Sequence, residues 1–307
     1  MSIALIFTRN DPTPWRDRLR KRLPGISIEN HSDIRDKEAV RFALCWKPEP
    51  GVFEQYKNLE VVQSLGAGVD HILNSQTLKD IRLTRIVDDN LSHDMWEFLL
   101  VAVLQYVKNF PAYHQYQLQK KWKPHRYTTI ADTHVSIMGI GKIGQYVARK
   151  FMEMGFTVRG WSSTRKSIPG IECYDAAELD TFLAHSGILI NLLPLTPETS
   201  GILNLSLFNK LIRQAYVINV GRGEHLVEQD LLKALDTDQL SGALLDVFAE
   251  EPLPEAHPFW VHPKITITPH VASLTNFDSA TDLIVENYSR MLSGDALLHE
   301  ISLEKGY

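Results

Sequence analysis

The chain has 307 residues, of which 44% are hydrophobic and 22% are charged, and its formal net charge at pH 7 is −5. A single hydrophobic core seldom organises so many residues, so we expect two domains. The acidic balance argues against a broad basic face for nucleic acid, and the longest apolar run, residues 98–104, is far shorter than the ~20 residues that span a bilayer. No signal-peptide pattern begins the chain, so we expect a cytoplasmic protein with no nucleic-acid and no membrane partner.

The N-terminal part of the chain alternates short apolar runs with helix-like segments. Trp15, Leu19 and Leu23 recur at helical spacing, and we interpret the basic residues among them, from Arg16 to Arg22, as the solvated face of an amphipathic helix. Such alternation of strands and helices is typical of a parallel α/β sheet. The predicted strands of this part cover residues 3–7, 26–28, 42–46, 61–65 and 83–87.

The pattern changes after residue 93. Residues 95–110 are apolar on nearly every side of a helix, which predicts a helix buried around most of its circumference, between domains or between subunits. The stretch that follows, residues 117–127, is polar and has no clear period.

A second alternation of strands and helices follows. The predicted strands cover residues 135–138, 157–161, 188–192, 216–220, 242–247 and 265–268. The predicted helices cover residues 142–153, 176–185, 226–236 and 276–292. We therefore predict an α/β fold with two Rossmann-like or flavodoxin-like parallel-sheet domains separated by a cleft. The first domain would comprise residues 1–93 and 275–307, and the second residues 94–274.

A glycine-rich turn opens the second sheet. Gly139, Gly141 and Gly144 have the spacing of a dinucleotide-binding loop, between a predicted strand and a predicted helix. The first glycine of such a loop permits a tight turn, the second lets the backbone approach a pyrophosphate, and the third lets the helix pack on the strand. The helix begins at Lys142 and Ile143, where free N–H groups and the helix dipole favour phosphate. We therefore predict that the second domain binds a dinucleotide.

The residues after the next strand indicate which dinucleotide is bound. An Asp or Glu that holds the ribose 2′-hydroxyl is expected about 20 residues after the loop, but Ser162 stands there. Ser163 adds a second hydroxyl, and Arg165 and Lys166 offer charge-assisted hydrogen bonds that suit the extra phosphate of NADP. We therefore predict NADP rather than NAD, with Arg165 as the first candidate for the phosphate contact.

Three polar stretches each follow a predicted strand of the second domain. They carry Arg222 between two glycines, Asp246 with Glu251 shortly after it, and His270 after a proline. Ligands of an open α/β sheet bind beyond the carboxyl ends of its strands, so Arg222, Glu251 and His270 are placed to converge near a bound cofactor. No cluster of histidines, cysteines and carboxylates has metal-ligand spacing, and we predict no metal site.

Six motifs in chain order resemble those of the D-2-hydroxyacid dehydrogenase family. They are GAGVDHI at 66–72, the glycine loop, NLLPLTPET at 191–199, NVGRGE at 219–224, LDVFAEEPLP at 245–254 and TPHVA at 268–272. Within the family, three further stretches and the final Gly306-Tyr307 resemble the reductases that act on glyoxylate and hydroxypyruvate. The three stretches are ALCWKPE at 43–49, WSSTRKSIPG at 161–170 and HPFWVHPKITITPHVA at 257–272.

This resemblance implies a role for each candidate residue. Arg222 would bind the carboxylate and the ketone oxygen of a 2-oxo acid, because its planar fork bonds two oxygens at once. His270 would act as the general acid that protonates the ketone oxygen during hydride transfer from the nicotinamide. Glu251, rather than the neighbouring Glu250, would hold His270 and favour its charged form. Asp246 would lie beside the nicotinamide ring and its amide.

Further contacts follow from the same resemblance. Leu193 and Pro194 would contact the cofactor, and Trp46 is a candidate for a wall of the substrate pocket. The first domain would then be the substrate domain, and the cleft would hold the active site. A small anion nest for the substrate carboxylate would be made by the backbone N–H groups of Gly66, Ala67 and Gly68.

The resulting prediction is an NADPH-dependent reductase that converts glyoxylate to glycolate or hydroxypyruvate to D-glycerate. The resemblance also implies a homodimer, with the helix at 95–110 and the polar stretch after it near the interface. Two alternatives stay open: another dehydrogenase or broad 2-oxo-acid reductase of the same family, and a non-catalytic protein that senses NAD or NADP. The complete set of Arg222, Glu251 and His270 argues against a sensor.

Overall fold

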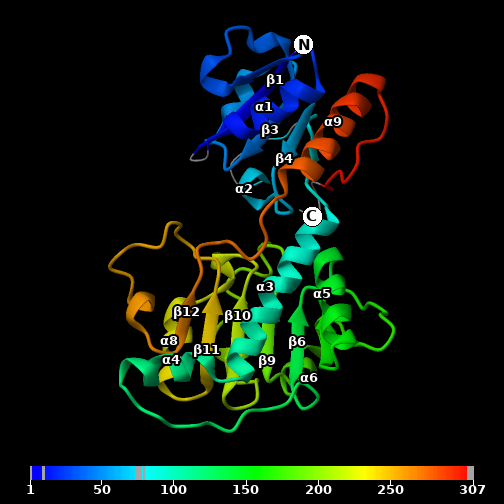
Figure 1. The fold of residues 1–307 in the computed structure, drawn as a ribbon. Coiled ribbons are helices and arrows are strands. Elements are labelled where there is room, and N and C mark those ends of the chain that lie inside the picture. Colours follow the sequence, from blue (N-terminus) through cyan, green and yellow to red (C-terminus); the bar gives the residue numbers. More distant parts are fainter. Residues whose placement is uncertain (1, 9–10, 74–77, 79, 303–307) are drawn as a thin grey trace. The chain divides into compact units, whose positions relative to one another are not determined.

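A computed structural model describes residues 2–8, 11–73, 78 and 80–302 of the chain (Figure 1). The ends of the predicted first domain, at residues 1 and 303–307, lie outside the described residues, and so does the Gly306-Tyr307 pair. The chain divides into two compact units, which we call unit 1 and unit 2. Unit 1 comprises residues 1–90 and 275–307, and unit 2 comprises residues 91–274.

Unit 1 contains a five-stranded parallel sheet in the order β2-β1-β3-β4-β5. The chain reverses its direction across the sheet between β1 and β3, which is the flavodoxin-like order. The strands are β1 (Ser2–Phe7), β2 (Ser27–Asn30), β3 (Val40–Trp46), β4 (Val61–Ser64) and β5 (Arg82–Thr84).

Helices cover both faces of this sheet. On one face lie α1 (Thr13–Arg22) and α9 (Phe277–Ser293), which meet where Trp15 and Phe277 have ring centroids 4.7 Å apart. On the other face, Ala43 and Cys45 of β3 pack with the core residues of η3 (Val52–Gln55) and α2 (Asp70–Leu73). Two short turns of helix, η1 (His31–Asp33) and η2 (Lys37–Ala39), complete the elements described in this unit.

The basic run of α1 is more than the solvated face that its sequence predicts. Arg18 lies 3.4 Å from Asp278 of α9, and Arg22 forms an ion pair with Asp282 of the same helix. These pairs are partly exposed, and each contributes little to stability alone. Their effect is to match the charge of α1 to that of α9, so the C-terminal helix docks on the N-terminal one.

Unit 2 contains a seven-stranded parallel sheet in the order β12-β11-β10-β9-β6-β7-β8. The chain reverses its direction across the sheet between β6 and β9. The strands are β6 (His134–Met138), β7 (Thr157–Trp161), β8 (Glu172–Tyr174), β9 (Ile188–Asn191), β10 (Ala215–Asn219), β11 (Leu240–Leu245) and β12 (Ile265–Ile267).

Two apolar clusters hold the helices of unit 2 on opposite faces of this sheet (Figure 1). One cluster joins the strands to α3 (Asp89–Val107) and α5 (Lys142–Glu153). The other joins them to α6 (Leu179–Leu183), α7 (Leu205–Phe208) and α8 (Glu228–Asp236). The remaining elements are α4 (Phe110–Leu118), η4 (Ala176–Glu178), η5 (Gly223–His225) and η6 (Pro258–Val261). The two parallel sheets confirm the predicted fold class.

The predicted helix at 95–110 differs most from the structure. The observed helix, α3, begins earlier, at Asp89, and ends at Val107. Asn109 then adopts a left-handed conformation, and α4 starts as a new helix at Phe110. The burial of α3 within unit 2 is also one-sided, because the side chain of Val101 is 55% exposed. The sequence did not predict the short strand β8, nor that α4 would extend to Leu118, into the polar stretch.

Candidate active site

The glycine loop lies where the sheet of unit 2 changes direction. A Cβ at Gly139, whose φ is +103°, would stand 2.6 Å from the carbonyl oxygen of Leu192, so only glycine lets the ends of β6 and β9 approach so closely. A Cβ at Gly144 would stand 2.0 Å from the Gly139 carbonyl oxygen, which explains the third glycine of the motif. A Cβ at Gly141 would meet only open space, and the helix α5 begins at the next residue, Lys142.

The N-terminus of α5 is open to an anion. Its N-cap residue is Gly141, which has no side chain to accept a hydrogen bond from the first turn, where Lys142 and Ile143 lie. Leu193, which follows β9 beside this turn, is buried, whereas Pro194 is exposed. Ligands of doubly wound sheets bind at such a reversal of strand order, because the loops of the two neighbouring strands part there.

The residues predicted to select the cofactor follow β7 directly. This strand ends at Trp161, so Ser162 occupies the position where an acidic residue is expected. The hydroxyl of Ser162 donates to the carbonyl of Thr164 at 2.7 Å, and Ser163 and Lys166 are exposed. Arg165 is exposed as well, but its guanidinium is already 3.1 Å from a carboxylate oxygen of Glu178.

Arg222 lies beyond the carboxyl end of β10 and close to the turn after β11. Its Nη1 donates to the carbonyl of Gly221 at 2.7 Å. A Cβ on the next residue, Gly223, would stand 1.9 Å from the carbonyl carbon of Phe248, so glycine is required for this approach. Because Phe248 donates its N–H to Glu251 at 3.2 Å, the Arg222 loop is placed beside the turn that carries Glu251.

Glu251 and His270 face one another. Both carboxylate oxygens of Glu251 lie 3.0 Å from Nδ1 of His270, and the two side chains are 20% and 35% exposed. A carboxylate only accepts hydrogen bonds when it is ionised, so Nδ1 of His270 carries its proton toward Glu251 and leaves Nε2 for another partner. Glu250 is exposed, and Glu251 is therefore the one of the two glutamates that contacts the histidine.

Asp246 holds the segment on which His270 lies. Its side chain is 1% exposed and accepts three hydrogen bonds: from the Thr268 hydroxyl at 2.6 Å and from the N–H groups of Val271 and Ala272, both at 2.9 Å. His270, between these donors, has a φ of +55°, which costs a residue other than glycine roughly 1–2 kcal/mol. The carboxylate therefore stabilises a strained turn.

Unit 1 groups the other predicted site residues at the carboxyl edge of its own sheet. Trp46 ends β3, and its indole ring would stand 2.7 Å from a Cβ at Gly66. The same ring lies 4.6 Å, centroid to centroid, from His71. The N–H of Gly66 donates to the Ser64 hydroxyl at 3.3 Å, so this amide has an acceptor within the loop. Only the other two residues of the predicted nest, Ala67 and Gly68, are partly exposed.

Arg85 belongs to the same edge, although no motif singled it out. It follows β5, and its Nη1 lies 3.5 Å from the carbonyl of Ala67. Burial lowers the pKa of this arginine, and among the described residues no carboxylate lies within ion-pair distance of it. A half-buried guanidinium without a counter-charge is costly, and it is a natural contact for an anionic ligand.

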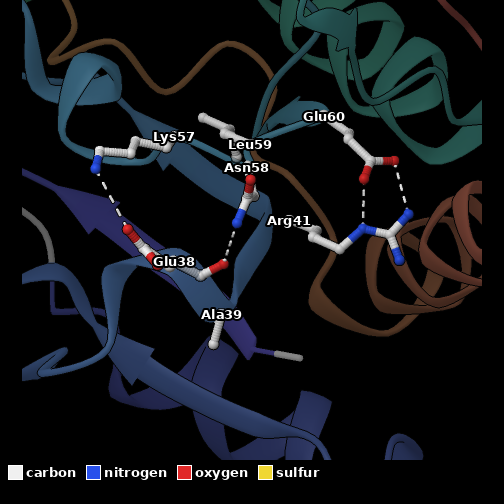
Figure 2. Close-up of a pocket in the computed structure, with 7 residues that line it drawn as sticks. All are labelled: Glu38, Ala39, Arg41, Lys57, Asn58, Leu59 and Glu60. Carbon is white, nitrogen blue, oxygen red and sulfur yellow. Dashed lines mark hydrogen bonds and ion pairs between the residues drawn. The ribbon is translucent and has the colours of Figure 1, made fainter.

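A surface hollow in unit 1 is not part of this arrangement. Figure 2 shows its lining, in which Lys57 pairs with Glu38 and Arg41 forms a two-pronged ion pair with Glu60. These residues lie at the amino ends of β3 and β4, the edge of the sheet opposite to Trp46. Because its charges are already paired, the hollow offers no group for a ligand.

The part of the chain that the structure describes contains neither a candidate membrane span nor a candidate metal site. No helix there combines the length and apolar character needed to cross a membrane. No group of three or more His, Cys, Asp or Glu side chains is arranged to hold a metal ion.

The comparisons with known proteins agree with the geometry. Residues 100–272, more than half of the chain, match the family described as D-isomer specific 2-hydroxyacid dehydrogenase, NAD binding domain. The chain belongs to this family. It is also 41% identical to the glyoxylate/hydroxypyruvate reductase A of Yersinia enterocolitica, with all of both chains covered.

Two solved structures of the same family resemble the chain along its whole length. One is an NADPH-dependent glyoxylate/hydroxypyruvate reductase from Sinorhizobium meliloti in complex with NADP and sulfate, which is 38% identical with a TM-score of 0.94 and full coverage of both chains. The other is a D-isomer specific 2-hydroxyacid dehydrogenase from Xanthobacter autotrophicus in complex with NADPH and MES, which is 35% identical with a TM-score of 0.94. The alignment with this second structure covers 100% of the present chain and 99% of the Xanthobacter chain.

Sequence reasoning missed one group that the structure places between the loops of this dehydrogenase fold. Asn191, Asn219 and His225 are completely buried and hydrogen-bonded to one another or to the Arg222 loop. Asn191 and Asn219 each end a strand, which is a signal for a polar site residue, and both lie in motifs quoted above. His225 lay outside those motifs and carried no signal of its own.

Proposed function

We propose that the protein reduces small 2-oxo acids with NADPH, converting glyoxylate to glycolate and hydroxypyruvate to D-glycerate. The observation that carries this proposal is the contact between Glu251 and His270 at 3.0 Å, in a unit that also presents Arg222 and an open glycine loop. The relatives named as glyoxylate/hydroxypyruvate reductases support the choice of substrates.

The residues around the glycine loop fit a dinucleotide. The uncapped start of α5 and the open space at Gly141 suit a pyrophosphate, which would take hydrogen bonds from the N–H groups of Lys142 and Ile143. Gly139 and Gly144 shape the turn, and Leu193 and Pro194 lie across the reversal point from it. A bound NADPH supplies the hydride that reduces the ketone.

The chain's own residues handle the proton and the charge. His270 transfers the proton on its Nε2 to the ketone oxygen, which becomes the hydroxyl of the 2-hydroxy acid, and the imidazole is reprotonated from water. Glu251 stabilises the charged imidazolium before the transfer and fixes which nitrogen faces the substrate. Arg222 binds the carboxylate and the ketone oxygen, and it stabilises the negative charge that develops there.

NADPH is favoured over NADH by the residues after β7. Ser162 replaces the acidic residue that would repel a 2′-phosphate, and Ser163, Arg165 and Lys166 are exposed and able to bond it. Arg165 must share its guanidinium between the phosphate and Glu178. The solved relatives in complex with NADPH and NADP support this preference.

Unit 1 supplies the second set of substrate contacts, and unit 2 supplies the cofactor site. In unit 1, Ala67 and Gly68 present backbone N–H groups to the carboxylate, Gly66 sets the approach of Trp46, and the indole forms a wall. Arg85 adds a cation beside Ala67.

A homodimer is part of the proposal. Large apolar side chains are exposed on α3, on α4 and on the stretch that follows, and Trp122 is fully exposed. Phe98 and Leu274 line a hollow beside Val101, together with Asp94 and Glu97. The exposed apolar side chains of this segment are Val101, Phe110, Leu118 and Trp122. Burial of such side chains against a second copy is favourable, and light scattering at micromolar protein would reveal a mass twice that of the 34.9 kDa chain. A cytoplasmic location, proposed with it, is tested by cell fractionation.

The mechanism is tested by variants of the acid and of the arginine. His270→Gln should remove at least about a hundredfold of kcat, the usual weight of a general acid, while leaving NADPH binding nearly unchanged. Arg222→Ala should lower kcat and also raise KM for the 2-oxo acid. If either variant kept near-wild-type turnover, the proposed roles would be wrong. A chain that bound NADPH tightly but never oxidised it with any 2-oxo acid would be the sensor.

A further inference from the structure

A completely buried histidine connects two of the proposed ligand loops of unit 2. His225 ends the short helix η5, three residues after Arg222. Its Nδ1 lies 3.1 Å from the backbone nitrogen of Arg222 and 2.8 Å from Nδ2 of Asn191. Its Nε2 lies 3.2 Å from the carbonyl oxygen of Pro194. The ring therefore touches the arginine loop on one side and the proposed cofactor loop on the other.

These partners fix the protonation state of the ring. The N–H of Arg222 and the amide group of Asn191 both donate, so Nδ1 of His225 must accept. The carbonyl of Pro194 accepts, so Nε2 must carry the proton. All three contacts are satisfied only by the neutral ring with its proton on Nε2, and a second proton would place a donor against two donors.

The surrounding amides leave this ring no other arrangement. Asn191 also donates to the side-chain oxygen of Asn219 at 2.9 Å, and its own oxygen accepts the N–H of Leu193 at 3.3 Å. Asn219 donates to the carbonyl of Arg222 at 3.0 Å and accepts the N–H of Gly221 at 3.2 Å. Both backbone groups of Arg222 are thus held by buried side chains, its N–H by His225 and its carbonyl by Asn219, which ends β10.

We propose that His225 is a positioning residue that sets the Arg222 loop and the Leu193–Pro194 loop in one fixed relation. This inference rests on the proposed function, because it takes Arg222 as the substrate contact and Leu193 and Pro194 as cofactor contacts. His225 touches neither ligand itself. A histidine is suited to the task because its two ring nitrogens point in opposite directions and differ in character, one accepting and one donating.

Two isosteric amides separate the two connections. In His225→Asn the side-chain oxygen can replace Nδ1 and keep Arg222 and Asn191, but nothing reaches Pro194. In His225→Gln the terminal amide can replace Nε2 and keep Pro194, but the acceptor for Arg222 is lost. His225→Leu removes both connections. His257→Asn is the matched control, because this partly buried histidine bonds Glu228 and caps η6 instead of bonding Arg222 or Pro194.

The expected result is a crossed pattern of Michaelis constants. His225→Asn raises KM for NADPH by about tenfold with little change for the 2-oxo acid, and His225→Gln raises KM for the 2-oxo acid by about tenfold with little change for NADPH, as expected for one lost hydrogen bond. His225→Leu raises both, and the control raises neither. Equal effects of Asn and Gln on both constants, or lower thermal stability with both constants unchanged, would overturn the proposal.

Failure of this inference is distinguishable from failure of the proposed function. If His270→Gln is inactive while the His225 variants show no crossed pattern, the function stands and the positioning role does not. If His270→Gln keeps its turnover, the proposed function itself fails. Nitrogen NMR of 15N-labelled protein gives a readout that needs no activity: the ring of His225 must carry its proton on Nε2, and a proton on Nδ1 would contradict the proposal.

Discussion

Replacement of Asp246 by asparagine probes how His270 is held. Aspartate accepts three hydrogen bonds, two on Oδ1 and one on Oδ2. Asparagine has one accepting oxygen and one donating amide, so whichever way it is oriented, the amide faces the N–H of Val271 or of Ala272. The Thr268 hydroxyl can reverse its bond, but a backbone N–H cannot. At least one buried N–H therefore loses its acceptor.

The size of the effect follows from these contacts. An unsatisfied buried N–H costs about 1–3 kcal/mol, and the strained His270, with φ of +55°, directly precedes the two affected amides. For a domain of this size, such a loss lowers Tm by roughly 2–12 °C. If the same energy is lost from the placement of His270 in the transition state, kcat falls roughly 5- to 160-fold. KM for NADPH should change less than kcat.

A double-mutant cycle with His270→Gln is the decisive assay. If Asp246 acts through His270, then Asp246→Asn should cost little further kcat once His270 has been replaced. The exposed Asp238, which precedes β11 and pairs with Lys264 instead of bonding the turn, gives the control Asp238→Asn with unchanged kinetics. An equal loss of kcat in both backgrounds would refute the reasoning. A rise confined to KM for NADPH would instead assign Asp246 to the nicotinamide contact.

Three other predictions concern charges and burial. Arg165→Ala should raise KM for NADPH by about tenfold and leave KM for NADH unchanged, because only NADPH carries the phosphate that competes with Glu178 for this guanidinium; equal changes for both cofactors would remove Arg165 from the phosphate site. Arg85→Gln should raise KM for glyoxylate by about tenfold. The control is Arg82→Gln, which should leave this KM unchanged because the guanidinium of Arg82 is already paired with Glu300. Equal kinetics of the two variants would exclude the anion contact. Burial raises the pKa of the Cys45 thiol, so above about pH 8.5 the unfolded chain releases a proton that the folded chain keeps. Between pH 8 and 10, the free energy of unfolding measured in urea should therefore fall for the wild type relative to Cys45→Ala, by at most about 1.4 kcal/mol per pH unit. If the difference in unfolding free energy between the two proteins stayed constant over this range, the buried thiol would be contradicted.

The sequence predicts those features that depend on a continuous local pattern or on a motif. Helix α5 and strand β7 have the predicted bounds, because an amphipathic period and a buried apolar run are both continuous there. Ser162 falls directly after β7, as the spacing from the glycine loop predicts. The pairing of Glu251 with His270 follows from a motif, and its geometry is present at 3.0 Å.

Other features depend on contacts that no local pattern records. Nothing near His225 distinguishes it from the eleven other histidines of the chain, because its role is set by Asn191 and Pro194 more than thirty residues away. Arg85 reads as an ordinary residue after a short strand. The apolar stretch at 95–110 predicts burial around most of a helix, between domains or between subunits, whereas within unit 2 the side chain of Val101 on α3 is exposed.

The central claim is that this chain is an NADPH-dependent reductase of small 2-oxo acids. It is tested most directly by steady-state kinetics of the purified wild-type protein with glyoxylate and with hydroxypyruvate, each measured with NADPH and with NADH at the same pH. We predict turnover of both acids, with kcat/KM for NADPH above that for NADH. No oxidation of either cofactor, or a higher kcat/KM with NADH, would contradict the account.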